Sequence, residues 1–201
     1  HVGREVLRAA SAHLTPVTLE LGGKSPCIVG ACTDLEVAAR RIIWGKLLNA
    51  GQTCVAPDYV LVKREAFHPL ITQMRRAIRS FYGDCPLQNP EYPKIINQKH
   101  YDRLTRLLKA SEILSGGGTD STLLKIEPTL VRAYSLEDAV MQEEIFGPIL
   151  PVIPVDSFAD AEEIIRALPK PLALYLFTDH HALRRRVLCT IPSGGVCVGD
   201  T

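Results

Sequence analysis

One cysteine of the chain stands in a setting in which it could act as a nucleophile. Cys54 lies in the stretch LLNAGQTCVA, where its neighbours are small or polar. The thiolate is the reactive form of cysteine, so such a site must lower the pKa of the thiol or supply a base. The helix expected just before Cys54 would present its C-terminal end, which does not favour a thiolate. The local sequence makes Cys54 a candidate nucleophile and leaves open that it is one more packed thiol.

An acidic residue, Glu20, interrupts the otherwise apolar stretch TLELGGK and could supply that base. The pattern predicts that Glu20 lies in a strand that ends at Gly22 and Gly23. If the strand is buried, the pKa of the carboxyl rises toward neutrality and the group suits general-base chemistry. If the strand lies at an edge, the side chain faces water, and both readings stay open. The two glycines would let the backbone approach a ligand closely.

The other five cysteines are expected in structural settings. Cys27, Cys189 and Cys197 lie in apolar runs and should pack as small hydrophobic residues, whereas Cys85 should lie in a loop. The six cysteines, Cys32 among them, are scattered and form no CxxC pair. We therefore expect reduced thiols and no disulfide framework. No Cys or His residues are spaced as zinc ligands are, so no metal site is expected.

Helical and strand-like patterns alternate along the chain. The stretch from Thr33 to Glu36 resembles a capping box, which predicts a helix with Thr33 as its N-cap. That helix should end between Asn49 and Gly51, with Gly51 in the left-handed conformation. Further helices are expected over residues 4–12, 68–82, 98–111, 159–168 and 181–190, and strands over 16–21, 26–31, 59–63, 148–155, 172–177 and 194–200. Such alternation predicts an α/β fold, a parallel-rich sheet covered by helices.

Composition excludes several classes of function. The 201 residues are 46% hydrophobic, enough for one good core or two small ones, and the formal net charge of +1 gives no basis for nucleic-acid binding. No apolar run is as long as a membrane span. The glycines at 116–118 predict a turn, because neither GK[ST] nor GxGxxG accompanies them.

The first residues, HVGREVLRAA, lack the layout of a signal peptide, so a cytoplasmic location is expected. They also start in mid-helix, which suggests a fragment.

Three motifs together resemble the active-site signatures of the aldehyde dehydrogenase superfamily. LELGGKSP contains Glu20, GQTC contains Cys54 at a distance of 34 residues, and EEIFGP follows at 143–148. The order and the spacing are those expected of that family. Stretches such as VMQEEIFGPILP and KPLALYLF are similar to the class 3 branch, whose members act on fatty and aromatic aldehydes. The resemblance covers essentially the whole chain.

The resemblance implies the oxidation of an aldehyde to a carboxylic acid with NAD or NADP as cofactor. Cys54 would form a thiohemiacetal and then a thioester, and Glu20 would activate the water that hydrolyses the thioester. An NAD(P)-binding role is implied for five further residues: Glu144 at the nicotinamide ribose, Phe146 beside the nicotinamide ring, Leu21 and Gly22 close to the nicotinamide, and Val2 near the adenine. Lys24 is expected to be structural.

The resemblance also implies a division of the chain. Residues 1–22 would be the C-terminal remnant of a Rossmann-like NAD(P)-binding domain, and residues 23–201 a catalytic domain truncated at its C-terminal end. The intact protein would be a homodimer, and it would associate with the endoplasmic-reticulum membrane only through a C-terminal tail absent from this chain. One departure is Gly199, since the family usually has Asn before the residue that matches Asp200.

Two alternatives predict the same fold. The chain could be a truncated paralogue without catalytic activity, or a thiol esterase that uses Cys54 and Glu20 without NAD(P). Addition of NAD(P) together with an aldehyde separates a dehydrogenase from an esterase, because only the dehydrogenase reduces the cofactor.

Overall fold

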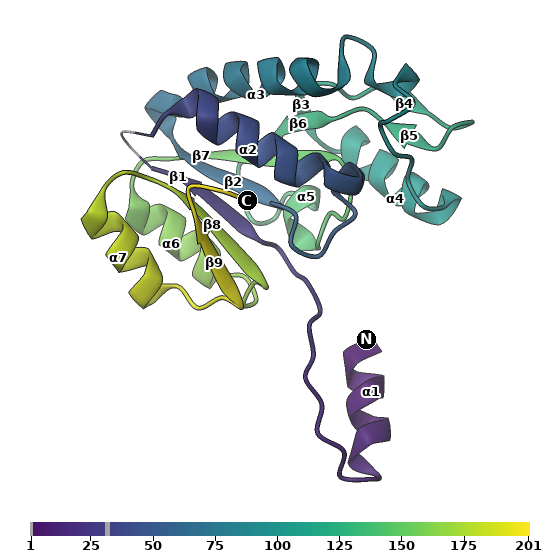
Figure 1. Cartoon of the computed structure of the whole chain (residues 1–201), viewed down its shortest axis with the longest axis vertical. Coiled ribbons are helices and arrows are strands. Elements are labelled where there is room, and N and C mark those ends of the chain that lie inside the picture. Colours follow the sequence, from purple (N-terminus) through teal and green to yellow (C-terminus); the bar gives the residue numbers. More distant parts are fainter. Residues whose placement is uncertain (1, 31–32) are drawn as a thin grey trace.

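The computed structural model describes residues 2–30 and 33–201, which form a compact body and a projecting arm (Figure 1). The body is a sheet with helices on both of its faces. The arm consists of α1 (Val2–Ser11) and an irregular stretch that leads from this helix into the first strand. Within the arm, α1 contacts the irregular stretch, since a Cβ atom on Gly3 would lie 2.9 Å from the side chain of Leu21 and 3.2 Å from that of Leu19.

The main sheet has seven strands in the order β3-β6-β7-β2-β1-β8-β9. Their bounds are β1 Pro26–Val29, β2 Tyr59–Lys63, β3 Glu112–Ser115, β6 Thr129–Arg132, β7 Ile149–Val155, β8 Ala173–Phe177 and β9 Gly195–Val198. Every neighbouring pair is parallel except β3 with β6, which is antiparallel. The predicted parallel-rich α/β sheet is confirmed. A separate hairpin pairs β4 (Thr119–Asp120) with β5 (Lys125–Ile126), just after the predicted glycine turn.

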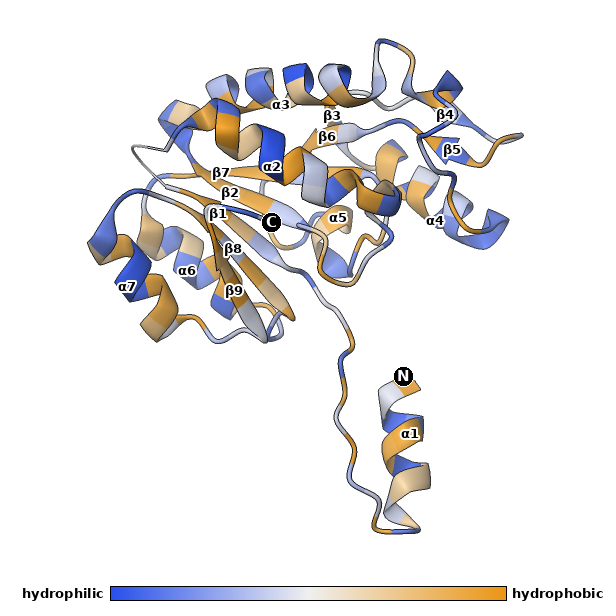
Figure 2. Cartoon of the chain, viewed as in Figure 1, coloured by the Kyte–Doolittle hydropathy of each residue, from blue (hydrophilic) through white to orange (hydrophobic). Residues whose placement is uncertain are grey.

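Helices cover both faces of the sheet, because the strands bury side chains on both of these faces. In β1, Cys27 and Val29 join one core and Ile28 joins the other, because successive side chains point to opposite faces. The longer helices are α2 (Leu35–Leu47), α3 (Phe67–Tyr82), α4 (Gln98–Lys109), α6 (Phe158–Arg166) and α7 (His181–Thr190); α5 (Ala139–Gln142) and the 3₁₀ turns η1 (Leu48–Gly51), η2 (Arg64–Ala66) and η3 (Pro86–Gln88) are short. Figure 2 shows hydrophobic strands between helices whose outer faces are mostly hydrophilic.

The strand expected over residues 16–21 is not formed. This stretch belongs to the arm, has no regular secondary structure, and leaves Glu20 and Leu21 exposed. A strand requires a neighbour to pair with its backbone N–H and C=O groups, and no strand of the described residues lies beside it. The reading of Glu20 as a buried strand residue is therefore wrong for this chain.

The start and the end of α2 differ from the prediction. Asp34, and not Thr33, is the N-cap, because an oxygen of Asp34 accepts hydrogen bonds from the N–H groups of Glu36 (2.9 Å) and Val37 (3.1 Å). The Thr33 hydroxyl instead donates to the carbonyl of Phe177 in β8. A contact with a distant strand thus replaces the predicted local cap.

The C-terminal end of α2 is more abrupt than predicted. The regular helix stops at Leu47, and Asn49 and Ala50 both have a φ of 53°. Gly51 has a φ of 75°, so its left-handed conformation is confirmed, but that conformation begins two residues earlier. Three successive residues with positive φ turn the chain sharply just ahead of Cys54.

The cysteines divide as expected with one exception. Cys27 is buried, Cys197 is half-buried and Cys85 is exposed in a loop, whereas Cys189, predicted to be buried, is exposed. Cys189 lies on α7, which buries only Val187, so its neighbours in the sequence are apolar but its face of the helix is turned to solvent. Cys32 lies outside the described residues.

The departure at Gly199 has a backbone explanation. Gly199 has a φ of 77°, a conformation that glycine adopts freely and asparagine more readily than most other residues. Either residue can therefore make this turn after β9.

Candidate active site

The loop that carries Cys54 packs against the loop of the third motif. Cys54 is exposed in a turn between η1 and β2. A Cβ atom added to Gly51 would overlap the carbonyl oxygen of Gly147, so the two backbones are in direct contact. The motifs GQTC and EEIFGP, about 90 residues apart in the sequence, therefore meet in space.

Gln52 fixes the chain on one side of Cys54. Its amide nitrogen donates to the carbonyls of Asn49 (3.0 Å) and Lys94 (3.1 Å), and its amide oxygen accepts from the N–H of Ile96 (2.9 Å). One side chain thus links the Cys54 loop to a segment some 40 residues away, which explains why the motif carries glutamine there.

Tyr175 fixes the other side of the Cys54 loop. Its hydroxyl, which comes from β8, donates to the carbonyl of Val55, the residue after Cys54. Burial raises the pKa of Tyr175 to about 12, so this donor keeps its proton at physiological pH. No carbonyl of the described residues takes the backbone N–H of Cys54, which leaves that group free to donate. Tyr175 was not predicted, because nothing in its own strand pattern marks it.

Glu144 connects the third motif to the first. A Cβ atom added to Gly22 would lie 2.7 Å from a carboxylate oxygen of Glu144, and Gly22 has a φ of 78°. Burial raises the pKa of the Glu144 carboxyl, and a hydrogen bond from the backbone of Gly23 opposes this effect. The predicted pair of glycines therefore approaches a half-buried carboxylate closely.

Phe146 has an unusual backbone. Its φ is 48°, and 37% of the residue is exposed. A bulky residue in the left-handed region is strained, and such strain persists only where the surroundings hold it. Phe146 is thus neither a core residue nor a freely mobile surface residue.

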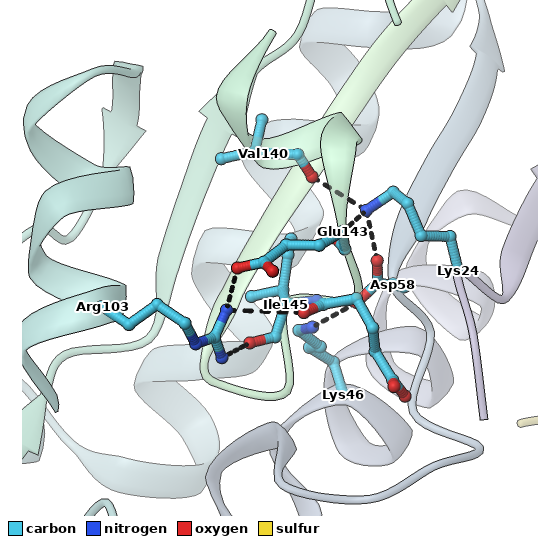
Figure 3. Close-up of polar contacts among 8 residues, drawn as sticks. Lys24, Lys46, Asp58, Arg103, Val140, Glu143 and Ile145 are labelled. Carbon is cyan, nitrogen blue, oxygen red and sulfur yellow. Dashed lines mark hydrogen bonds and ion pairs between the residues drawn. The ribbon is translucent and has the colours of Figure 1, made fainter. Parts of the chain in front are cut away.

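A buried ion pair supports the segment that carries Glu144. Lys24 pairs with Asp58 and also donates to the carbonyls of Val140 (2.8 Å) and Glu143 (3.1 Å), as Figure 3 shows. The other oxygen of Asp58 accepts from the N–H of Ile145 (3.0 Å). The structural role expected of Lys24 is confirmed, whereas the sequence did not single out Asp58.

Arg103, on α4, holds the same segment from the other side. Its guanidinium donates to the side chain of Glu143 (3.0 Å) and to the carbonyls of Glu144 (3.5 Å) and Ile145 (Figure 3). The backbone on both sides of Glu144 is therefore hydrogen-bonded to charged side chains. Arg103 was not predicted, because nothing in its own helix marks it.

Of the candidate residues on the arm, Gly22 lies against Glu144, but Glu20, Leu21 and Val2 are not brought to the other candidates. Glu20 is exposed, and no hydrogen bond or ion pair of the described residues joins it to Cys54. Leu21 is 64% exposed and Val2 72% exposed. Within the arm, Leu21 contacts α1, since a Cβ atom on Gly3 would lie 2.9 Å from its side chain.

Gly51→Ala is expected to destabilise the protein by about 3 kcal/mol or more, because the substitution combines positive-φ strain with a clash against the backbone of Gly147. Gly83→Ala is a matched control: Gly83 has a φ of 77°, but nothing lies within 4 Å of the added Cβ. The control keeps the backbone strain without the clash and should cost about 1–3 kcal/mol, less than Gly51→Ala. Urea-induced unfolding of both variants measures the difference, and equal losses would show that the two loops do not pack as described.

Residues 2–30 and 33–201 contain neither a membrane-spanning helix nor a cluster of metal ligands. No helix there is both long enough and apolar enough to cross a bilayer. No three His, Cys, Asp or Glu side chains of these residues are grouped so that they could hold a metal ion.

Comparisons with known proteins agree with the motifs. The profile described as "Aldehyde dehydrogenase family" matches residues 1–201. "Aldehyde dehydrogenase family 3 member A2" of Macaca fascicularis is 44% identical over 199 residues, which are 99% of this chain and 41% of that protein. "Aldehyde dehydrogenase, dimeric NADP-preferring" of Rattus norvegicus is 43% identical over 199 residues, 99% of this chain and 44% of that protein.

A solved structure is similar over the whole chain. "Substrate bound state of Staphylococcus Aureus AldH" has a TM-score of 0.97 and 47% sequence identity, and the match covers 100% of this chain and 44% of that one. The chain thus spans about two fifths of the length of the proteins it matches.

Proposed function

Since the chain belongs to the aldehyde dehydrogenase family, we propose that it is the catalytic part of an enzyme that oxidises an aldehyde to a carboxylic acid with NAD or NADP. The observation that carries this proposal is the meeting of three motifs: Gly51 lies against Gly147, and Gly22 lies against Glu144. The nucleophile, Cys54, and a carboxylate that can bind sugar hydroxyls, Glu144, therefore lie on adjoining loops.

In the proposed first step, the Cys54 thiolate attacks the carbonyl carbon of the aldehyde. A carbon–sulfur bond forms, and the carbonyl oxygen takes up the negative charge. The free backbone N–H of Cys54 is a suitable donor to this oxygen, because preorganised donors stabilise charge that develops in the transition state. The hydrogen bonds made by Gln52 and Tyr175 limit movement of the loop, so the sulfur and the backbone N–H of Cys54 keep fixed positions relative to each other.

In the second step, the carbon bound to the sulfur of Cys54 would lose a hydride and become a thioester; NAD or NADP, which Glu144, Phe146, Leu21 and Gly22 would hold, would supply the acceptor for that hydride. Glu20 then removes a proton from a water molecule, which attacks the thioester carbon. The carbon–sulfur bond breaks, the acid leaves, and the thiolate of Cys54 is restored. The assignment of Glu20 rests on its motif and on its place two residues before Gly22, which adjoins Glu144.

The residues around Glu144 suit the nicotinamide end of a dinucleotide. A half-buried carboxylate can accept hydrogen bonds from ribose hydroxyls, and the absence of a side chain at Gly22 leaves room beside it. Phe146 and Leu21 offer apolar surface for the nicotinamide ring, and Val2 is assigned to the adenine. The rat relative is named NADP-preferring, so both NAD and NADP are retained.

We assign residues 1–22 to a dinucleotide-binding domain and residues 23–201 to a catalytic domain, within a longer chain. The match to only 41% and 44% of two relatives' length supports the longer chain, and the arm, which is separate from the sheet, supports the division. Apolar side chains stand exposed on the arm, among them Leu14 at 91%, as expected of a surface that another domain or subunit covers.

The name of the rat relative includes "dimeric", which favours a homodimer. Free cysteines favour the cytoplasm, and any association with the endoplasmic-reticulum membrane would need a segment outside this chain.

The test of the proposed function uses the full-length protein with benzaldehyde or a medium-chain aldehyde. Reduced cofactor and carboxylic acid should appear in equal amounts. Hydrolysis of a nitrophenyl ester without any cofactor reduction would favour the thiol esterase, and neither reaction would favour a non-catalytic paralogue.

The 201-residue chain alone is expected neither to bind NAD measurably nor to oxidise aldehydes. Dinucleotide affinity comes largely from a phosphate-binding turn, a helix N-terminus and a ribose-binding acid, and the chain retains only residues assigned to the nicotinamide end and to the edge of the adenine site. Titration calorimetry with millimolar NAD and an absorbance assay for reduced cofactor provide the measurement. Saturable binding, or cofactor reduction that is lost on Cys54→Ala, would contradict the expectation.

A further inference from the structure

The turn that carries Cys54 is closed by one backbone hydrogen bond. The N–H of Ala56 donates to the carbonyl of Thr53 (3.2 Å), so Cys54 and Val55 are the central residues of the turn. The Thr53 carbonyl and the Cys54 N–H belong to the same peptide unit. Because a trans amide directs its C=O and its N–H to opposite sides, the Cys54 N–H is directed away from the bond that closes the turn.

Tyr175 adds a second hydrogen bond to the same series. Its hydroxyl donates to the carbonyl of Val55, and that carbonyl shares a peptide unit with the N–H of Ala56. The series therefore begins at the phenol, passes through the Val55–Ala56 amide and the Thr53–Cys54 amide, and ends at the N–H of Cys54. No carbonyl of residues 2–30 and 33–201 accepts this last N–H.

Hydrogen bonds in such a series strengthen one another. An amide whose carbonyl accepts a hydrogen bond becomes more polarised, and its own N–H becomes a better donor, by about 10–30% per bond. The first members of the series are shielded from water, since Tyr175 is 6% exposed and Ala56 is 7% exposed. Solvent therefore screens little of the polarisation before it reaches Cys54, whose side chain is exposed.

The packing of the core does not require a hydroxyl at position 175. Tyr175 in β8 lies in register between Cys27 of β1 and Cys197 of β9, and it packs in the hydrophobic core. Phenylalanine would fill this place without the cost of burying a polar group. Among the described residues, the carbonyl of Val55 is the only partner of the hydroxyl. Burial raises the pKa of Tyr175 to about 12, so the phenol stays protonated and acts as a donor.

We propose that Tyr175 is a positioning residue for the oxyanion site: through the turn from Thr53 to Ala56, its hydroxyl orients and polarises the Cys54 N–H that stabilises the negative charge on the substrate oxygen. This inference rests on the proposed function, in which Cys54 is the nucleophile and its N–H is the oxyanion donor. Tyr175 touches neither substrate nor cofactor in this scheme. It acts through two amides, and its effect is largest in the transition state, where the charge on the oxygen develops.

Tyr175→Phe in the full-length protein removes the donor and keeps the ring. One oxyanion donor is worth about 10²- to 10³-fold in rate, and loss of the polarisation should remove a part of that. The burst of reduced cofactor after rapid mixing should therefore be about two- to tenfold slower. The Kd for NAD should not change, because the residues assigned to the cofactor are untouched. A burst at the unchanged rate would overturn the proposal.

Tyr92→Phe is the matched control. The Tyr92 hydroxyl is also buried and also donates to a backbone carbonyl, that of Ile126 (2.7 Å), but this bond does not lead to Cys54. The two variants should lose similar stability to urea, and only Tyr175→Phe should slow the burst. Equal slowing in both variants would show that the effect is not specific to the series, and the proposal would fail.

Fluorinated tyrosines at position 175 separate polarisation from simple anchoring of the turn. Monofluorinated and difluorinated tyrosine keep nearly the shape of tyrosine, but their phenols are progressively more acidic and therefore stronger donors. Burial keeps these phenols protonated at neutral pH. They retain the hydrogen bond to Val55 and with it any anchoring role, and they give an answer even if Tyr175→Phe does not fold. The burst rate should rise with the acidity of the phenol, whereas one rate for all three phenols would contradict the proposal.

Infrared difference spectroscopy reads the hydrogen bond to the substrate oxygen directly. An excess of a nitrophenyl ester labelled with carbon-13 at its carbonyl acylates Cys54 without cofactor, and the carbonyl stretch of the thioester reports the strength of the donor at its oxygen. That band should move to higher frequency in Tyr175→Phe and to progressively lower frequency with the fluorinated phenols. A band at one position in all these proteins would overturn the proposal. A full-length protein that forms no reduced cofactor from aldehyde and NAD or NADP would instead contradict the proposed function.

Discussion

Cys54→Ala is expected to abolish aldehyde oxidation by the full-length protein, with kcat lowered roughly 10⁴-fold or more. The sulfur of Cys54 forms the covalent bond to the substrate in the proposed scheme, and no other group of the loop can replace it. The loop is held by Gln52 and Tyr175, not by Cys54, whose side chain is exposed. The variant should therefore fold normally and bind NAD as before. Cofactor reduction and calorimetry on the same sample measure both properties.

The other exposed cysteines provide the control. Cys85→Ala and Cys189→Ala should each keep substantial activity, although both of these residues are exposed, as Cys54 is. Iodoacetamide near neutral pH should label Cys54 first, since the thiolate fraction sets the rate. Equal labelling of the three thiols, or an active Cys54→Ala protein, would remove Cys54 from the mechanism.

Glu20→Gln should leave hydride transfer largely intact and slow the release of the acid by on the order of 10²-fold or more. Rapid mixing should then show one burst of reduced cofactor per site, followed by slow turnover. An acyl group should remain on Cys54 and be visible by mass spectrometry, because the thioester forms but water is not activated.

The opposite pattern would assign Glu20 to the first step. If its carboxylate mainly removes the proton of Cys54, the burst itself should be slow, and no acyl group should accumulate. Glu20→Asp is a useful companion, since it keeps the charge but shortens the reach. Partial recovery of turnover with Glu20→Asp would support a role as a base.

The sequence predicted five of the seven strands of the main sheet (β1, β2, β7, β8 and β9) and the longer helices, because each of them carries its own pattern, but it missed β3 and β6. It failed where the outcome depends on a distant partner. Residues 16–21 have a strand pattern but no strand to pair with. Thr33 has the right chemistry for a cap, yet its hydroxyl bonds to Phe177 instead. Cys189 has apolar neighbours in the chain, but its helix turns it outward.

The same limit applies to the candidate site. Cys54 and Glu144 could be named because they lie in short motifs, but the residues that hold those motifs could not. Tyr175 lies 120 residues from Val55, whose carbonyl it binds, and Asp58 lies 87 residues from Ile145. Neither contact leaves a trace in the local pattern. Such residues emerge only once the topology brings the segments together.

The long sequence separations around Lys24 also determine when the site can form during folding. Lys24 bonds to Val140, 116 residues away, and Cys27 in β1 pairs with Tyr175 in β8. Local helices form within microseconds, whereas contacts between residues so far apart wait for large loops to close. A refolding chain should therefore regain its helical content early and assemble the loops around Cys54 and Glu144 in its last steps. Until then the reactive thiol of Cys54 would lack the loop contacts that orient it.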